Sequence, residues 1–116
     1  MDSKFSLMNK SLSKIIFCYS PFPNREEALN IAKKLKDQKL IACANVLSEG
    51  TSVFEWDGQI HEDAEVYVVF KTTLERSEDF VRTLEELHPY EVPAIVVLEA
   101  QANLSYAQWV KEQVTS

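Results

Sequence analysis

The chain has 116 residues, of which 46% are hydrophobic, and its formal net charge is −6. This length favours one domain with a single hydrophobic core. An acidic chain without a basic run is a poor electrostatic match for phosphate backbones and anionic membranes, so we expect no nucleic-acid partner. No apolar run reaches the roughly 18 residues that a spanning helix needs, so we expect no membrane insertion.

The first 14 residues are polar and include three lysines. They lack the apolar run and the cleavage site of a secretory signal. We interpret residues 1–14 as a polar tail that becomes extended near Leu12, and residues 15–116 as one domain. Cys18 and Cys43 do not form a CxxC motif. Two such thiols fit a reduced, cytoplasmic protein better than a disulfide framework.

The first half of the domain predicts a strand, a helix and a second strand. Ile15–Ser20 is β-branched and aromatic, as a strand would be. Asn24 with Glu27 three residues later is the pattern of a helix N-cap with a capping box. Apolar residues at helical spacing extend this helix from about Arg25 to Gln38. The apolar run Leu40–Leu47 predicts a buried strand.

A hairpin is expected next. Gly50 permits a bend or bulge in a long second strand, and Asp57–Gly58 is typical of a tight hairpin turn. The returning strand has its strongest pattern at Glu65–Thr72, with apolar residues on one face. We expect the charged pair Glu62–Asp63 to interrupt the strand before that point.

The second half predicts a helix that begins near Thr73 or Ser77 and ends at His88. The two prolines of His88–Pro93 make a stiff corner, because proline cannot continue a helix. This corner is either a simple connector or a rigid loop that presents His88, Tyr90 and Glu91 to a ligand or a neighbouring subunit. The apolar run from Pro93 to about Ala100 predicts a buried strand.

A short final helix, capped by Asn103 or Ser105, completes the order β-α-β-β-α-β-α. Right-handed crossovers place both long helices on one face of an antiparallel sheet, which gives an α+β, ferredoxin-like sandwich with an extra C-terminal helix. The opposite face carries apolar side chains, among them Trp56, Tyr67 and Val69. Large exposed apolar patches usually mark an interface, so the sequence predicts an oligomer.

Most catalytic motifs are missing from the sequence. With only Gly50 and Gly58 present, neither a dinucleotide-binding glycine motif nor a P-loop can form. A nucleophile elbow is missing, and no acid/base pair stands out. The two cysteines and two histidines lie on different predicted elements, which argues against a closed zinc site. We therefore expect a binding or signalling protein that is not an enzyme and requires no cofactor.

Weaker metal sites are compatible with the sequence. His61 precedes two carboxylates, which is either a metal-binding group or the more common solvated turn. Cys18 offers a soft-metal ligand, or it is a small buried hydrophobe. Glu65 and Lys71 share one face of a strand, where each is costly to bury unless it is paired.

Several stretches together resemble the CutA (CutA1) divalent-cation tolerance proteins, over nearly all of residues 15–114. The stretches that carry this resemblance are Leu40–Asn45, Ser52–Gly58, Glu65, Lys71–Thr72, His88–Pro93 and Tyr106–Trp109.

The resemblance implies a ferredoxin-like fold that assembles as a compact homotrimer similar to PII signalling proteins. It also implies a role in tolerance of copper and other divalent cations, with no settled reaction. Cys18 lines up with a first-strand cysteine that is a copper-ligand candidate in bacterial members. Phe54 stands where the family commonly has tyrosine.

The sequence therefore gives two sets of candidate site residues. The candidate ligands for Cu²⁺ or another divalent cation are Cys18, His61 and His88. The residues expected at a cleft between subunits are Trp56, Glu65, Lys71, Tyr90, Glu91 and Trp109. The alternative is a PII-like signalling or scaffold trimer that binds a small molecule in this cleft and has no metal role.

Overall fold

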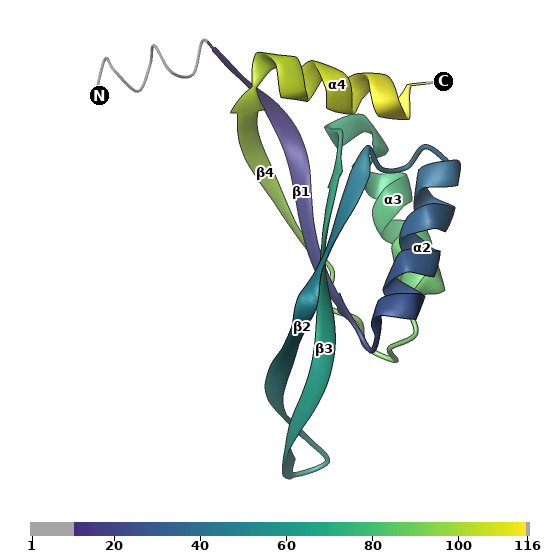
Figure 1. Cartoon of the computed structure of the whole chain (residues 1–116), viewed down its shortest axis with the longest axis vertical. Helices are drawn as coiled ribbons and strands as arrows, with labels where there is room; N and C mark the ends of the chain where they lie inside the picture. Colours follow the sequence, from purple (N-terminus) through teal and green to yellow (C-terminus); the bar gives the residue numbers. More distant parts are fainter. Residues whose placement is uncertain (1–10, 116) are drawn as a thin grey trace, which may run out of the picture.

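The computed structural model describes residues 11–115 and contains four strands and three helices (Figure 1). In chain order these are β1 (Leu12–Phe22), α2 (Arg25–Asp37), β2 (Cys43–Trp56), β3 (Gln59–Thr72), α3 (Leu74–Leu87), β4 (Val96–Asn103) and α4 (Leu104–Val114). The sheet order is β2-β3-β1-β4, and every neighbouring pair is antiparallel. This topology confirms the predicted ferredoxin-like sandwich with a C-terminal helix.

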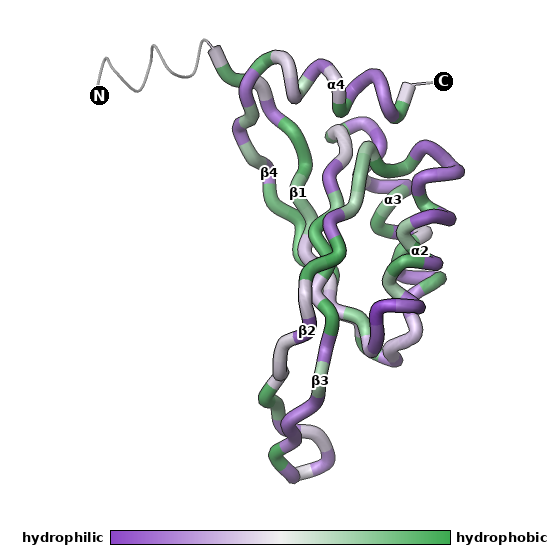
Figure 2. Tube along the Cα trace, viewed as in Figure 1, coloured by the Kyte–Doolittle hydropathy of each residue, from purple (hydrophilic) through white to green (hydrophobic). Residues whose placement is uncertain are grey.

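Helices α2 and α3 cover one face of the sheet and enclose the main hydrophobic core (Figures 1 and 2). The rings of Phe22, Phe70 and Phe80 are fully buried there, with ring centroids of successive pairs 6.2 Å and 5.4 Å apart. The predicted caps also form: the Asn24 side chain accepts a hydrogen bond from the Glu27 amide at 2.9 Å, and Thr73 caps α3.

Helix α4 packs against the opposite face of the sheet, at one end only (Figure 1). It contributes Ala107, Val110 and Val114 to a second, smaller core that also contains Ile15 and Ala42. The rest of that sheet side is left uncovered by helices within the described chain. We call this uncovered part the open face; its side chains are Phe17, Tyr19, Tyr67, Val69, Val96 and Leu98.

The open face is an apolar surface. Val96 and Leu98 keep 48% and 55% of their area exposed, and the rings of Tyr19 and Tyr67 stack with centroids 6.0 Å apart. Glycine at position 50 lets Tyr67 lie close to the neighbouring strand, because a Cβ there would collide with the tyrosine ring. The uncovered apolar face is what the sequence predicted for an oligomer interface.

Strands β2 and β3 extend beyond the sheet as a two-stranded arm, formed by residues 50–65 (Figure 1). The turn residues Asp57 and Gly58 have φ angles of 53° and 75°, as a type I′ hairpin turn requires. A register shift between Val46 and Glu49 marks the predicted irregularity beside Gly50. This shift and the long arm confirm the expected long, bent second strand.

Several predicted strand features were wrong. Glu62–Asp63 does not interrupt β3, because the ladder is made by backbone groups and the exposed arm leaves charged side chains in solvent. Strand β2 begins at Cys43 and not at Leu40, because the first ladder pair is Cys43 with Lys71. Strand β4 begins at Val96 and not at Pro93, because its pairing with β1 ends at Val96. Neither β2 nor β4 is a buried strand within one chain, because both lie at the edges of the sheet.

The expected extension of the tail near Leu12 is confirmed, since β1 begins there and Leu12–Lys14 pairs with β4. Residues 1–10 of the predicted tail lie outside the described residues.

Candidate functional site

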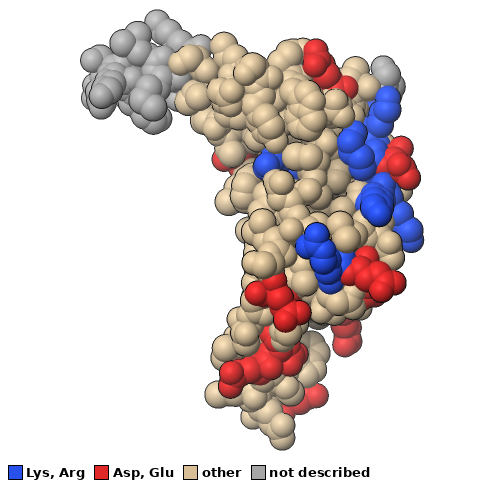
Figure 3. Space-filling model, viewed as in Figure 1, with Lys and Arg blue, Asp and Glu red and all other residues tan. Residues whose placement is uncertain are grey.

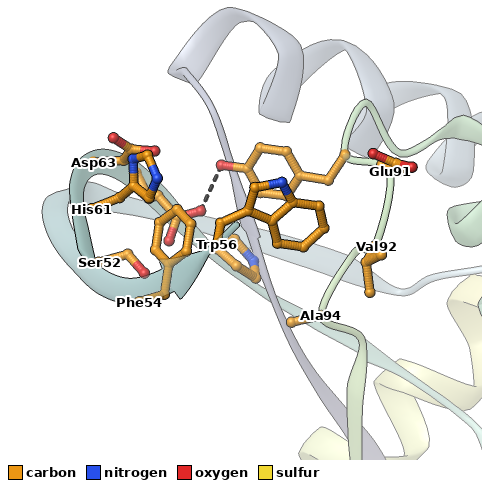
Figure 4. A pocket seen from close by; sticks show the side chains of 11 residues that line it. Ser52, Phe54, Trp56, His61, Asp63, Glu91, Val92 and Ala94 are labelled. Atoms are coloured by element: carbon orange, nitrogen blue, oxygen red, sulfur yellow. Dashed lines mark hydrogen bonds between the residues drawn. The ribbon is translucent and has the colours of Figure 1, made fainter. Parts of the chain in front are cut away.

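A groove lies between the arm and the loop that follows α3, and it encloses about 550 Å³ (Figure 4). Its lining residues come from the arm formed by β2 and β3, from the 90–94 loop and from the end of β1. They are Pro21, Ser52, Phe54, Trp56, His61, Asp63, Glu65, Tyr90, Glu91, Val92 and Ala94.

Strand alternation explains why the arm residues share one side of the groove. Phe54 pairs with His61 and Ser52 pairs with Asp63, and directly opposed residues of an antiparallel pair point to the same face. The rings of Phe54 and His61 stack with centroids 5.5 Å apart. The position of Asp63 beside His61 is visible in Figure 4. One wall therefore presents an aromatic ring, an imidazole and a carboxylate together.

A short hydrogen bond connects the arm to the loop of residues 90–94, which we call the corner loop. The Tyr90 hydroxyl donates to Glu65 Oε2 at 2.5 Å, and Glu65 is only 9% exposed (Figure 4). Burial, followed by this hydrogen bond to the carboxylate, raises the pKa of Tyr90 above its usual value. The hydroxyl therefore stays protonated and remains a donor, which fixes the width of the groove at its base.

His88 is a structural residue of the corner. It is 7% exposed, and its ring stacks on Phe22 with centroids 4.4 Å apart. Its Nδ1 accepts a hydrogen bond from the Tyr90 amide at 3.2 Å, so Nε2 carries the proton and donates to the Pro21 carbonyl at 2.9 Å. Both ring nitrogens therefore have partners within the chain, and His88 does not line the groove, whereas Tyr90 and Glu91 do.

Stability should depend on pH through His88. Burial lowers the pKa of this imidazole below its usual 6.5, an effect only partly opposed by the Pro21 carbonyl and by Glu27 and Glu65. The unfolded chain then binds more protons than the folded one, so stability is lost as pH falls below about 6.5. Urea unfolding between about pH 7 and about pH 5 should show this decline, and His88→Gln should flatten it. An equally steep decline in His88→Gln would assign the effect to other groups.

Cys18 lies in the main core, 0% exposed, and burial raises the pKa of its thiol to about 12. A protonated, buried thiol is a poor metal ligand, so the geometry favours the packing role over the metal role. Cys18 pairs with Phe70, and His61 lies nine residues from Phe70 along β3, which places the two side chains on the order of 30 Å apart.

One chain therefore does not bring Cys18, His61 and His88 together. Within residues 11–115, no three His, Cys, Asp or Glu side chains are grouped so as to hold a metal ion. Of the three candidates, only His61 lines the groove and has an imidazole that reaches solvent.

The predicted cleft residues divide between two places. Trp56, Glu65, Tyr90 and Glu91 meet at the groove, whereas Lys71 and Trp109 lie at the other end of the sheet beside α4. We call this second group the Lys71 cluster; its members are Cys43, Asn45, Lys71, Tyr106 and Trp109.

Short contacts connect the residues of the Lys71 cluster. Lys71 donates to Asn45 Oδ1 at 2.7 Å, and its ammonium group lies 5.5 Å from the centre of the Tyr106 ring. Tyr106 stacks on Trp109 and lies 3.4 Å from Cys43 Sγ through its hydroxyl oxygen. Burial and the contact with Cys43 raise the pKa of Tyr106 to about 12.

Sequence reasoning missed several of these residues. In the groove, Asp63 was expected at a strand break and was also weighed with His61 and Glu62 as a metal-binding group, but its shared face with Phe54 was not recognised, although it follows from counting back from the Asp57–Gly58 turn. Asn45 and Tyr106 in the Lys71 cluster appeared only within stretches that carry the family resemblance, and their proximity was not predicted because they lie on elements that are far apart in the chain.

Two comparisons of sequence place the chain among known proteins. The family model described as CutA1 divalent ion tolerance protein matches residues 16–113. The divalent-cation tolerance protein CutA of Thermotoga maritima is 44% identical over 101 residues, which cover 86% of this chain and 99% of that protein. Protein CutA of Homo sapiens is 39% identical over 98 residues, which cover 81% of this chain and 53% of that protein.

Solved structures agree with the sequence comparisons. The divalent ion tolerance protein CutA1 of Ehrlichia chaffeensis superposes with a TM-score of 0.85 at 35% identity, over 88% of this chain and 96% of that chain. CutA1 of Pyrococcus horikoshii gives 0.82 at 36% identity, over 87% and 99%. Among the described residues, none of the helices has the length and apolar character needed to cross a membrane.

Proposed function

Because this chain belongs to the CutA1 divalent ion tolerance family, we propose that it is a homotrimeric divalent-cation tolerance protein that binds its metal ion at the groove. The observation that carries the metal proposal is the pairing of an accessible imidazole, His61, with the carboxylate of Asp63 on one wall. Copper is the preferred ion, because imidazole and carboxylate ligands bind Cu²⁺ above the other first-row divalent ions.

The trimer proposal rests on the open face and on the free sheet edges. Strands β2 and β4 are the edge strands of the sheet, and each can pair with a strand of another chain. The apolar side chains of the open face would then be buried against neighbouring subunits. Since one chain supplies too few grouped donors, the remaining metal ligands come from a second subunit or from water.

We place the protein in the cytoplasm, where its two free cysteines remain reduced, and we assign it a binding role rather than a catalytic one. A relative from Archaeoglobus fulgidus, 30% identical, is called a periplasmic divalent cation tolerance protein. Fractionation of the native host, with detection of the chain in each compartment, tests the cytoplasmic assignment.

Copper titration separates the three candidate ligands. We expect His61→Ala to weaken Cu²⁺ binding at least about tenfold, because it removes the accessible donor. Gln59→Ala, on the same exposed arm strand, should bind as the wild type does and serves as the control. Cys18→Ser should keep wild-type affinity and lose stability only. Wild-type affinity in His61→Ala would remove the groove from the metal proposal.

The second candidate is a PII-like signalling or scaffold trimer that binds a small molecule and has no metal role. The observation that favours it is the groove itself, whose volume of about 550 Å³ is typical of small-molecule pockets and whose walls include the rings of Phe54, Trp56 and Tyr90. Metal titration alone would then give no stoichiometric binding, while a small organic ligand would bind.

A further inference from the structure

We propose that the groove binds a small organic cation, an amine or guanidinium compound with an apolar body. This inference rests on the second candidate function, that the groove takes a small molecule. Three aromatic rings and three carboxylates line the groove, and its lining includes neither lysine nor arginine. The rings belong to Phe54, Trp56 and Tyr90, and the carboxylates to Asp63, Glu65 and Glu91.

The aromatic rings provide surface for a cation with an apolar body. The Trp56 and Phe54 side chains line the groove and remain 49% and 39% exposed, so their rings are accessible to a ligand. The Trp56 ring reaches from the arm toward Val92 and Ala94 of the corner loop (Figure 4). A cation over the face of tryptophan gains more than over any other ring, and the gain rises when the site excludes water.

The carboxylates give the groove a negative charge. Glu65 lies at the base, 9% exposed, and the Tyr90 hydroxyl holds it in place, while Asp63 lies on the arm wall. Acidic side chains also gather over the arm in Figure 3, and lysine and arginine side chains gather away from it. An anion is therefore disfavoured in this groove, and a cation is attracted to it.

The same features favour an organic cation over a bare metal ion. A metal ion needs several grouped oxygen, nitrogen or sulfur donors, and within residues 11–115 no three His, Cys, Asp or Glu side chains, those of the groove included, are grouped so as to hold a metal ion. It would also leave the aromatic walls uncovered. The other candidate cation for the groove is a lysine side chain from a second copy of the chain. Its thin four-carbon stem covers less of the aromatic walls than a free molecule with an apolar body does.

Calorimetry on the full-length assembled protein tests the inference with 2-phenylethylammonium chloride and its neutral counterpart 2-phenylethanol. We expect the ammonium compound to bind one site per chain and at least about tenfold more tightly than the alcohol. Asp63→Asn should weaken ammonium binding about threefold or more. Asp79→Asn removes an equal charge from the surface of α3 and should have little effect.

Each other outcome overturns the inference. Equal binding of the ammonium compound and the alcohol leaves a neutral small-molecule pocket, so the second candidate function survives without the cation. Absence of binding by both probes removes both proposals. Ammonium binding that appears only after the assembly is disrupted shows that a side chain of a second copy fills the groove. Sedimentation of the same samples reports the assembly state independently of binding.

Discussion

A chain carrying Leu98→Glu is expected to remain folded but to sediment as a single 13.3 kDa subunit. Leu98 pairs with Phe17 across β4 and β1 and is 55% exposed on the edge strand of the open face. A glutamate there would place an unpaired charge in an apolar interface. The free energy of burying this charge is several kcal/mol, which is about as much as the interface contributes to association. The melting temperature should also fall, because association stabilises the folded chain by mass action.

Leu74→Glu is the matched control for this experiment. Leu74 is 58% exposed in the first turn of α3, outside the open face, where an acidic residue suits the helix dipole. We expect this variant to keep the wild-type assembly and melting temperature. If Leu98→Glu also sediments like the wild type, the open face is not the surface through which the chains associate.

His88→Ala is expected to lower the free energy of unfolding by about 3 kcal/mol. It removes a buried ring that stacks on Phe22, and it leaves the Pro21 carbonyl and the Tyr90 amide without their partners. The corner loop that holds one side of the groove should loosen as a result. Urea unfolding at one fixed protein concentration, in chelator-treated buffer, measures the change.

The control is His61→Ala, which removes the other histidine of the chain. His61 lies on the exposed arm and contacts Phe54, so its loss should cost less than about 1 kcal/mol. Equal losses for the two variants would contradict the structural role of His88. A His88→Ala variant with wild-type stability and weakened copper binding would instead support His88 as a metal ligand.

The fold was predictable because local signals agreed with the tertiary structure. Capping at Asn24, the turn at Asp57–Gly58 and the alternation of Val66, Val68 and Phe70 each fixed one element. Other strand ends were not predictable: Leu40, Ile41 and Ala42 are apolar because they are buried, yet β2 begins only at Cys43, where its pairing with β3 begins.

The site was only partly predictable. Trp56, Glu65 and Tyr90, which were expected at a cleft between subunits, lie together at the groove of one chain, whereas Lys71 and Trp109 of the same expected set do not line it. No pattern in the sequence distinguished buried from exposed donors, so Cys18 and His88 were equal to His61 as metal candidates. Burial separates them: the first two are packed in the interior, and only His61 reaches the groove.

In the proposed trimer the open face is covered by other copies of the same chain, and sedimentation equilibrium of the wild-type protein at micromolar concentration measures this association. We expect one species with a mass of three 13.3 kDa chains, unchanged when the protein is diluted. A single species of 13.3 kDa under the same conditions would contradict it.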